Sequence, residues 1–110
     1  MSTWLYRIRP TRPALLSTGP TPAEQALIGR HFAYLQELTQ RGIVHLAGRT
    51  TTTEEEGMGL VIFSAPGEPE ARALMEGDPA VAGGVFAARL FPYRVALLNV
   101  DSLAEAQRVG

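Results

Sequence analysis

The chain has 110 residues, a net charge of −1 and a hydrophobic fraction of 45%, which together predict one domain with a buried core. Its charges are spread along the chain, so neither nucleic acid nor an anionic membrane is expected as a partner. It contains no cysteine, and its ten basic residues are all arginine, which excludes disulfides, thiolate sites and lysine Schiff bases. A secretory signal and a long apolar span are both missing, so we expect a cytoplasmic protein.

The first predicted elements are a strand, a loop and a long helix. Residues 3–9 alternate Trp4, Tyr6 and Ile8 with Leu5 and Arg7, the period of a strand. The proline-rich stretch that follows predicts a loop. The helix then starts at Thr21, whose side chain can cap it together with Glu24, and ends at Gly42, which suits a left-handed backbone.

One side of this helix is predicted to be buried. Its apolar stripe has spacings of three and four residues and comprises Leu27, His31, Tyr34, Leu35 and Leu38. His31 therefore lies along the buried stripe, where it can be either an acid/base group or a core histidine with a satisfied hydrogen bond. Tyr34, one turn later, can donate a hydrogen bond to a ligand or simply fill the core.

The second half is predicted to contain two strands, a short helix and a last strand. The strands are residues 43–48 and 58–64, joined by a polar hairpin connection. Residues 67–77 form the short helix, and the last strand lies within 84–98 with a bend or edge position at Pro92. Residues 99–110 are expected to be a frayed helical turn or tail.

This order of elements predicts an α+β fold of the ferredoxin-like βαββαβ type, with an antiparallel sheet and both helices on one face. The other face also carries apolar residues, among them Met58, Leu60 and Ile62, and residues 95–98 ("VALL") are apolar on both sides. Water does not suit such a face. We therefore expect a homodimer that packs sheet to sheet, although the C-terminal tail can provide part of the cover.

Two further side chains have both a structural and a functional interpretation. Asp78 stands in "MEGDPAVAGGVF", where an aspartate before proline typically bonds nearby backbone N–H groups in a turn. His45 alternates with Ile43 and Ala47 in a strand, and no carboxylates have matching spacing. A metal site is therefore not expected.

The complete pattern resembles the YciI-like (YCII-related) family over about residues 3–98. "GRHFAYLQELTQRGIVHLAG" is followed by a "GLVIFSA" strand and by "MEGDPAVAGGVFAARLFPYRV". The resemblance implies a single ferredoxin-like domain that dimerises through its sheet, and a proposed active site with a histidine and an aspartate, which here are His31 and Asp78. Members with an assigned reaction resemble small lyases or isomerases, including a dehydrochlorinase acting on a chlorinated hydroxylated ring.

One loop departs from the family pattern. Where many relatives continue with Gly-Pro and an acidic loop, Gly48 is followed here by Arg49 and "TTTTEEEG". Arg49 can contact an anionic group of a substrate, as Tyr34 can donate to one, or it can simply be solvated. The substrate is therefore expected to differ from that of relatives.

Three functions remain open from the sequence. The first is an acid/base enzyme that needs no cofactor or metal, in which Asp78 orients His31 for proton transfer to and from a small polar organic molecule. The second is a dimeric, non-catalytic module that binds a metabolite or a protein. The third is a cofactor-free oxygenase or a haem-handling protein, since other dimeric α+β barrels do such work.

Overall fold

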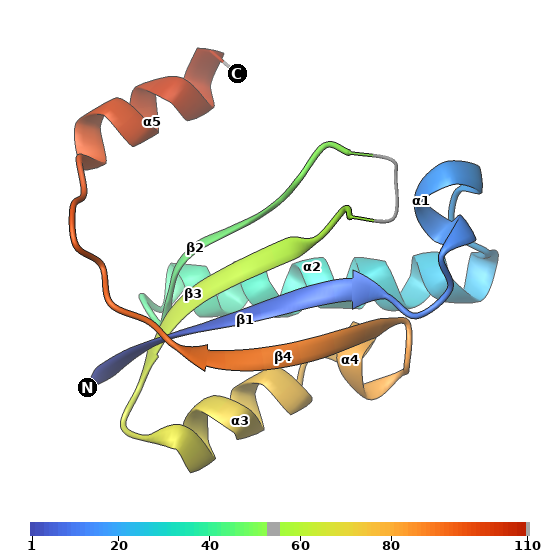
Figure 1. Cartoon of the computed structure of the whole chain (residues 1–110), viewed down its shortest axis with the longest axis horizontal. Helices are drawn as coiled ribbons and strands as arrows, with labels where there is room; N and C mark the ends of the chain where they lie inside the picture. Colours follow the sequence, from blue (N-terminus) through green and yellow to red (C-terminus); the bar gives the residue numbers. More distant parts are fainter. Residues whose placement is uncertain (53–55, 110) are drawn as a thin grey trace.

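The computed structural model describes residues 1–52 and 56–109, in which four strands and five helices follow one another along the chain (Figure 1). The strands are β1 (Ser2–Pro10), β2 (Val44–Arg49), β3 (Gly59–Ala65) and β4 (Phe86–Pro92). The helices are α1 (Ala14–Thr18), α2 (Pro22–Gln40), α3 (Glu68–Glu76), α4 (Pro79–Ala82) and α5 (Val100–Val109).

The strands form one antiparallel sheet in the order β2-β3-β1-β4. This order, with α2 and α3 as the two crossover helices, is the ferredoxin-like arrangement that the sequence predicts. The central strands are β1 and β3, and Tyr6 lies opposite both Val61 and Leu90. Every second side chain of β1, including Tyr6, therefore points into the interior of the domain.

The core lies between the sheet and the two crossover helices, α2 and α3, on what we call the inner face. Buried side chains from β1 and β3 meet those of α2 and α3 there: Trp4, Tyr6, Ile8, Val61, Phe63, Leu35, Leu38, Ala71 and Met75. Since the strand residues alternate and share one face, both helices cover that same face. In Figure 1, α2 runs behind the strands. We call the opposite side of the sheet the outer face.

The ends of α2 follow the sequence signals. The Thr21 side chain accepts from the backbone N–H of Glu24, and the Glu24 side chain accepts from that of Thr21, which completes a capping box. Past the other end, Gly42 has a φ of 77°, a backbone conformation that favours glycine. The predicted helix is confirmed, and its stripe faces the core, with Leu35 and Leu38 buried and the other three residues partly buried.

Several local predictions are wrong. A short helix, α1, interrupts the predicted loop because Leu15 packs in a small cluster with Ala80 and Val85. The last strand, β4, lies within the predicted range 84–98, and Pro92 is on an edge strand as predicted, but the apolar residues 95–98 lie outside the sheet and are exposed. The predicted tail forms the ten-residue helix α5. Residues 53–55 of the predicted hairpin connection lie outside the described residues.

Candidate active site

His31 and Asp78 lie in direct hydrogen-bonding contact although 47 residues separate them in the chain. His31 comes from the middle of α2, and Asp78 from the junction of α3 and α4. His31 Nδ1 is 2.8 Å from Asp78 Oδ1 and 2.7 Å from Oδ2. The tertiary structure therefore brings together the two residues that the family resemblance selects, while their role in catalysis stays a prediction.

Asp78 is fixed by its own backbone as well as by its neighbours. It is the N-cap of α4, and its Oδ1 accepts a hydrogen bond of 3.0 Å from the backbone N–H of Ala80. The turn interpretation of "GDP" is therefore correct locally, and the turn continues as a short helix. The Asp78 side chain is 0% exposed, so its charge depends on hydrogen bonds from protein groups.

A third residue, Tyr6, holds the carboxylate from the sheet. Its hydroxyl donates a hydrogen bond of 2.7 Å to Asp78 Oδ2, and Tyr6 is 0% exposed. We missed this residue in the sequence, where Tyr6 appears only as one of the apolar positions of β1. A signal was present, because a tyrosine on the buried side of a central strand needs an acceptor for its hydroxyl.

The protonation of this cluster follows from its hydrogen bonds. Burial acts to raise the pKa of Asp78, but the hydrogen bonds from His31 and Tyr6 outweigh it, and the pKa lies below its usual value. Burial, together with the nearby Asp78 charge, raises the pKa of Tyr6. Asp78 is therefore an ionised acceptor and Tyr6 a protonated donor at neutral pH.

The ionised carboxylate determines the tautomer of His31. Because Asp78 can only accept, His31 Nδ1 carries a proton, and the neutral ring then has its lone pair on Nε2. Within the described residues Nε2 has no hydrogen-bond partner, and 14% of the His31 side chain is exposed. The ring also meets the edge of Phe86, with centroids 5.4 Å apart. The free nitrogen is the one that can accept a proton.

The other predicted site residues lie in different surroundings. The half-buried Tyr34 donates its hydroxyl proton to Leu74 O at 2.7 Å, so only its lone pairs remain for a ligand. Arg49 ends β2 and is exposed, without a described contact to the dyad. Their roles in substrate binding stay predictions. His45 is exposed on β2, with Nε2 2.6 Å from Ser64 Oγ.

Other features of the described residues bear on ligands. Within residues 1–52 and 56–109, no three or more histidine or acidic side chains come together as they would around a metal ion, and no helix has the length and apolar character of a membrane span. Two open surface hollows are lined by α5 and by the residues around the end of β4. Neither of these hollows includes His31.

The model of the YCII-related domain matches residues 4–91, which contain most of the sheet and the His31–Asp78 pair. The chain belongs to the YCII-related family. No curated protein matches the sequence.

Two solved structures are similar to this chain, and the one with the higher TM-score shares its fold. One is 5-chloro-2-hydroxyhydroquinone dehydrochlorinase (TftG) from Burkholderia phenoliruptrix AC1100, in complex with 2,5-dihydroxybenzoquinone. It has a TM-score of 0.59 and 21% identity, over 83% of this chain and 93% of that chain. Another is SnoaB, a cofactor-independent oxygenase from Streptomyces nogalater, with a TM-score of 0.46 and 13% identity, over 88% of this chain and 96% of that chain.

Proposed function

We propose that this YCII-related protein is an acid/base enzyme of the lyase or isomerase type, acting on a small polar organic molecule without a cofactor. His31 Nε2 is the base, and Asp78 orients the ring. The observation that carries the proposal is the hydrogen bond between His31 Nδ1 and the buried Asp78 carboxylate, which turns Nε2 away from the carboxylate and leaves it without a partner among the described residues.

This arrangement suits the removal of a proton from a carbon next to a carbonyl or from a ring hydroxyl. The proton passes to Nε2, and the electron pair that it leaves behind forms a new double bond within the substrate. In an elimination a leaving group such as chloride departs with its bonding electrons, whereas in an isomerisation His31 returns the proton to another atom. Asp78 stabilises the imidazolium that forms between these steps.

The dehydrochlorinase of similar fold suggests which substrates to test. Its substrate is a chlorinated, hydroxylated ring, which has both an acidic hydroxyl and a leaving group. We propose the same broad class, small hydroxylated rings or related enols, as the first probes for this protein. The different sequence after Gly48, beginning with Arg49, leads us to expect a different preference among them.

The proposal is tested by turnover of 5-chloro-2-hydroxyhydroquinone and unchlorinated hydroxyquinols, followed by chloride release and absorbance. A second readout, exchange of substrate protons with deuterated water, detects proton transfer even where no product accumulates. We expect His31→Gln to lower kcat by about 10²- to 10⁴-fold, with an unchanged circular dichroism spectrum. The matched control His45→Gln removes the exposed histidine and should leave kcat unchanged. Equal rates in both variants would contradict the proposal.

A non-catalytic binding module is the second candidate, and the low exposure of His31 favours it. With 14% of its side chain exposed, His31 offers little surface to a substrate. A binding module predicts no proton exchange with any of these probes, and ligand binding that His31→Gln leaves intact. Calorimetric titration of both proteins with the same compounds separates the two candidates.

We further propose that the protein is a homodimer in which a second copy covers the outer face. Leu5, Ile62 and Phe91 are only partly buried on this face, and Leu60 is exposed. Contiguous apolar surface of this kind commonly marks an interface. Sedimentation of the full chain tests the stoichiometry, and a monomer at micromolar concentration would contradict it.

A further inference from the structure

The last part of the chain extends away from the domain as an arm, which we define as residues 93–109. It leaves the sheet at the end of β4, runs without regular structure to residue 99, and ends in α5, which lies apart from the sheet in Figure 1. Its apolar side chains face solvent: Leu97 is 95% exposed and Leu98 is 67% exposed. The matched YCII-related domain ends at residue 91, so the arm lies beyond the part shared with the family.

The helix of the arm is too short to be stable alone. Asn99 caps it by accepting from the N–H of Ser102 at 2.9 Å, but isolated helices of fewer than about 12–15 residues are marginal in water, and α5 has ten. Val100, Leu103 and Ala104 follow the spacing of one helix side, and Val100 is 65% exposed. The helix therefore needs another surface for its apolar side.

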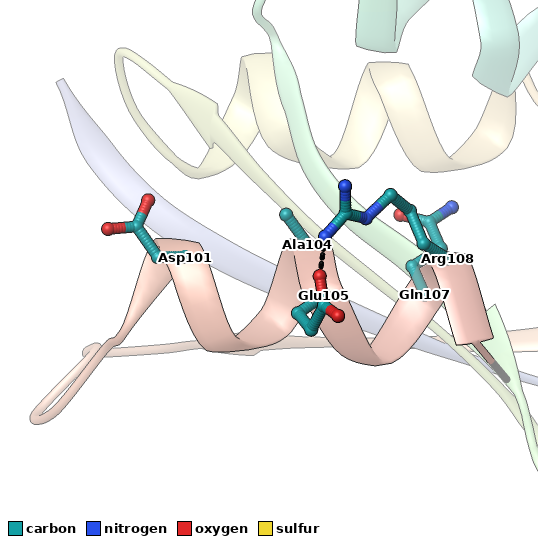
Figure 2. A pocket seen from close by; sticks show the side chains of 5 residues that line it. All are labelled: Asp101, Ala104, Glu105, Gln107 and Arg108. Carbon is teal, nitrogen blue, oxygen red and sulfur yellow. Dashed lines mark ion pairs between the residues drawn. The ribbon is translucent and has the colours of Figure 1, made fainter.

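A different side of α5 is charged. Figure 2 shows Asp101, Glu105 and Arg108, which are spaced at four and three residues. Glu105 pairs with Arg108, whereas Asp101 has no ion pair among the described residues. The arm can thus present apolar side chains together with carboxylates.

The outer face of the sheet has the complementary character. Its apolar row crosses all four strands in register and consists of Leu46, Ile62, Leu5 and Phe91. In the next row Arg7 lies directly opposite Arg89, and both guanidinium groups stand over the Phe91 ring, at 5.7 and 5.1 Å from its centroid. Neither arginine has an ion pair within the described part of the chain.

Two like charges directly opposite each other on neighbouring strands are unfavourable. Arg9 lies two residues beyond Arg7 on the same strand and therefore adds a third positive charge to the outer face. If two outer faces met with nothing between them, these arginines would also approach those of the other copy. A segment with both carboxylates and apolar side chains would neutralise the arginines and cover the apolar row. The arm is such a segment.

We propose that the arm of one copy packs on the outer face of a second copy. Leu97 and the apolar side of α5 cover the apolar row, while Asp101 and Glu105 approach Arg7 and Arg89. The exchange is reciprocal, so each copy both gives an arm and receives one. This inference concerns assembly and does not depend on the proposed catalytic function.

The test uses two charge-reversed full-length chains and their mixture. The face variant carries Arg7→Glu and Arg89→Glu, and the arm variant carries Asp101→Arg and Glu105→Arg. Each variant alone sets like charges against each other in both exchanged contacts, so its dimer dissociation constant should rise at least about tenfold. In the mixture both contacts pair opposite charges, so a one-to-one heterodimer should form with an affinity close to that of the unmodified protein.

Sedimentation velocity and light scattering measure these masses. An arm that folds back on its own sheet predicts no rescue on mixing, and this result would overturn the proposal. A monomeric unmodified protein, or a dimer that both variants leave unchanged, would overturn it as well. Because the altered side chains lie at the surface, circular dichroism should show intact folding in every case.

Two controls separate specific contacts from general effects of charge. Glu37→Arg with Glu76→Arg makes the same change of net charge on exposed positions of α2 and α3 and should leave the dissociation constant unchanged. Leu97→Asp removes only an apolar contact of the arm and should weaken the dimer without preventing its heterodimer with the unmodified chain. Equal weakening by the control pair and the arm variant would overturn the proposal.

Discussion

The inner and outer faces of the sheet are made from alternate residues of the same strands, yet they have different partners. On the inner face, Tyr6 and Phe63 are fully buried beneath the helices, with ring centroids 5.8 Å apart. On the outer face, Phe91 is only partly buried and two arginines stand over its ring. The strand period places apolar residues on both faces, but within the described chain helices cover only the inner one.

The polar groups of the inner-face site have hydrogen-bond partners, whereas the arginines of the outer face have no ion pair within the described part of the chain. The Tyr6 hydroxyl and the Asp78 carboxylate satisfy each other in the core, and His31 completes the group. Arg7 and Arg89 lie opposite each other on the outer face without an ion pair among the described residues. A buried network of this kind holds its members rigidly and suits a functional site, whereas unpaired charges beside apolar side chains suit an interface.

The largest expected difference between the faces comes from deleting one ring on each. Phe63→Ala leaves a cavity in the core and should lower the free energy of unfolding by about 3–5 kcal/mol. Phe91→Ala removes a ring of the same size from the outer face, and the loss should stay below about 1.5 kcal/mol in the separated chain. Urea denaturation at low protein concentration measures both, and equal losses would contradict the distinction.

Removing the carboxylate at the centre of the inner network should have the next largest effect. Asp78→Ala leaves the buried Tyr6 hydroxyl and the N–H of Ala80 without their acceptor, and each such group costs about 1–3 kcal/mol. We expect a loss of roughly 2–4 kcal/mol in urea denaturation. Asp101→Ala, at the exposed aspartate of α5, is the matched control and should change the stability of the domain little.

A smaller effect is expected from the tyrosine beneath the carboxylate. Tyr6→Phe keeps the ring and removes one hydrogen bond to Asp78, for an expected loss of about 1–2 kcal/mol. If Tyr6 positions Asp78, this variant should also shift the pH profile of turnover. Tyr34→Phe, which removes the bond to Leu74 O, should leave that profile unchanged. Identical profiles for all three proteins would exclude a positioning role for Tyr6.

Lowering the pH should produce the smallest effect on stability. Despite the opposing effect of burial, hydrogen bonds from His31 and Tyr6 lower the pKa of Asp78, and the hydrogen bond from Arg12 lowers the pKa of Glu24 to about 2. A carboxyl group with a lowered folded-state pKa stabilises the protein above its unfolded-state pKa, and this stability is lost as the pH falls through the folded-state pKa.

Urea midpoints should therefore be constant above about pH 5 and decline towards pH 2. Asp78→Asn removes one of the two groups, so its midpoint should start lower at pH 7 and decline less steeply. Glu24→Gln provides the comparison for the second group, at the capped start of α2. A decline of equal steepness in Asp78→Asn and the unmodified protein would show that Asp78 does not contribute to acid sensitivity.

Much of the fold could be predicted because its signals are local. The alternation in residues 3–9 and the capping signals from Thr21 to Gly42 each depend on a few neighbouring residues, and both are confirmed. The errors occur where distant contacts decide the outcome. The cluster of Leu15 with Ala80 and Val85 allows α1, and residues 95–98 lie outside the sheet although their apolar run suited a strand.

The candidate site also has features that depend on local sequence and features that depend on distant contacts. The sequence by itself determined that His31 lies on the buried stripe of α2 and that Asp78 occupies a turn, because helix period and proline geometry are properties of short segments. Only the tertiary structure brought Asp78 within 2.7 Å of His31 and within 2.7 Å of the Tyr6 hydroxyl. The packing of α2 against α4, and the side chain of Tyr6 reaching Asp78 from β1, set these distances, and contacts between residues 47 and 72 positions apart are not encoded in any local pattern.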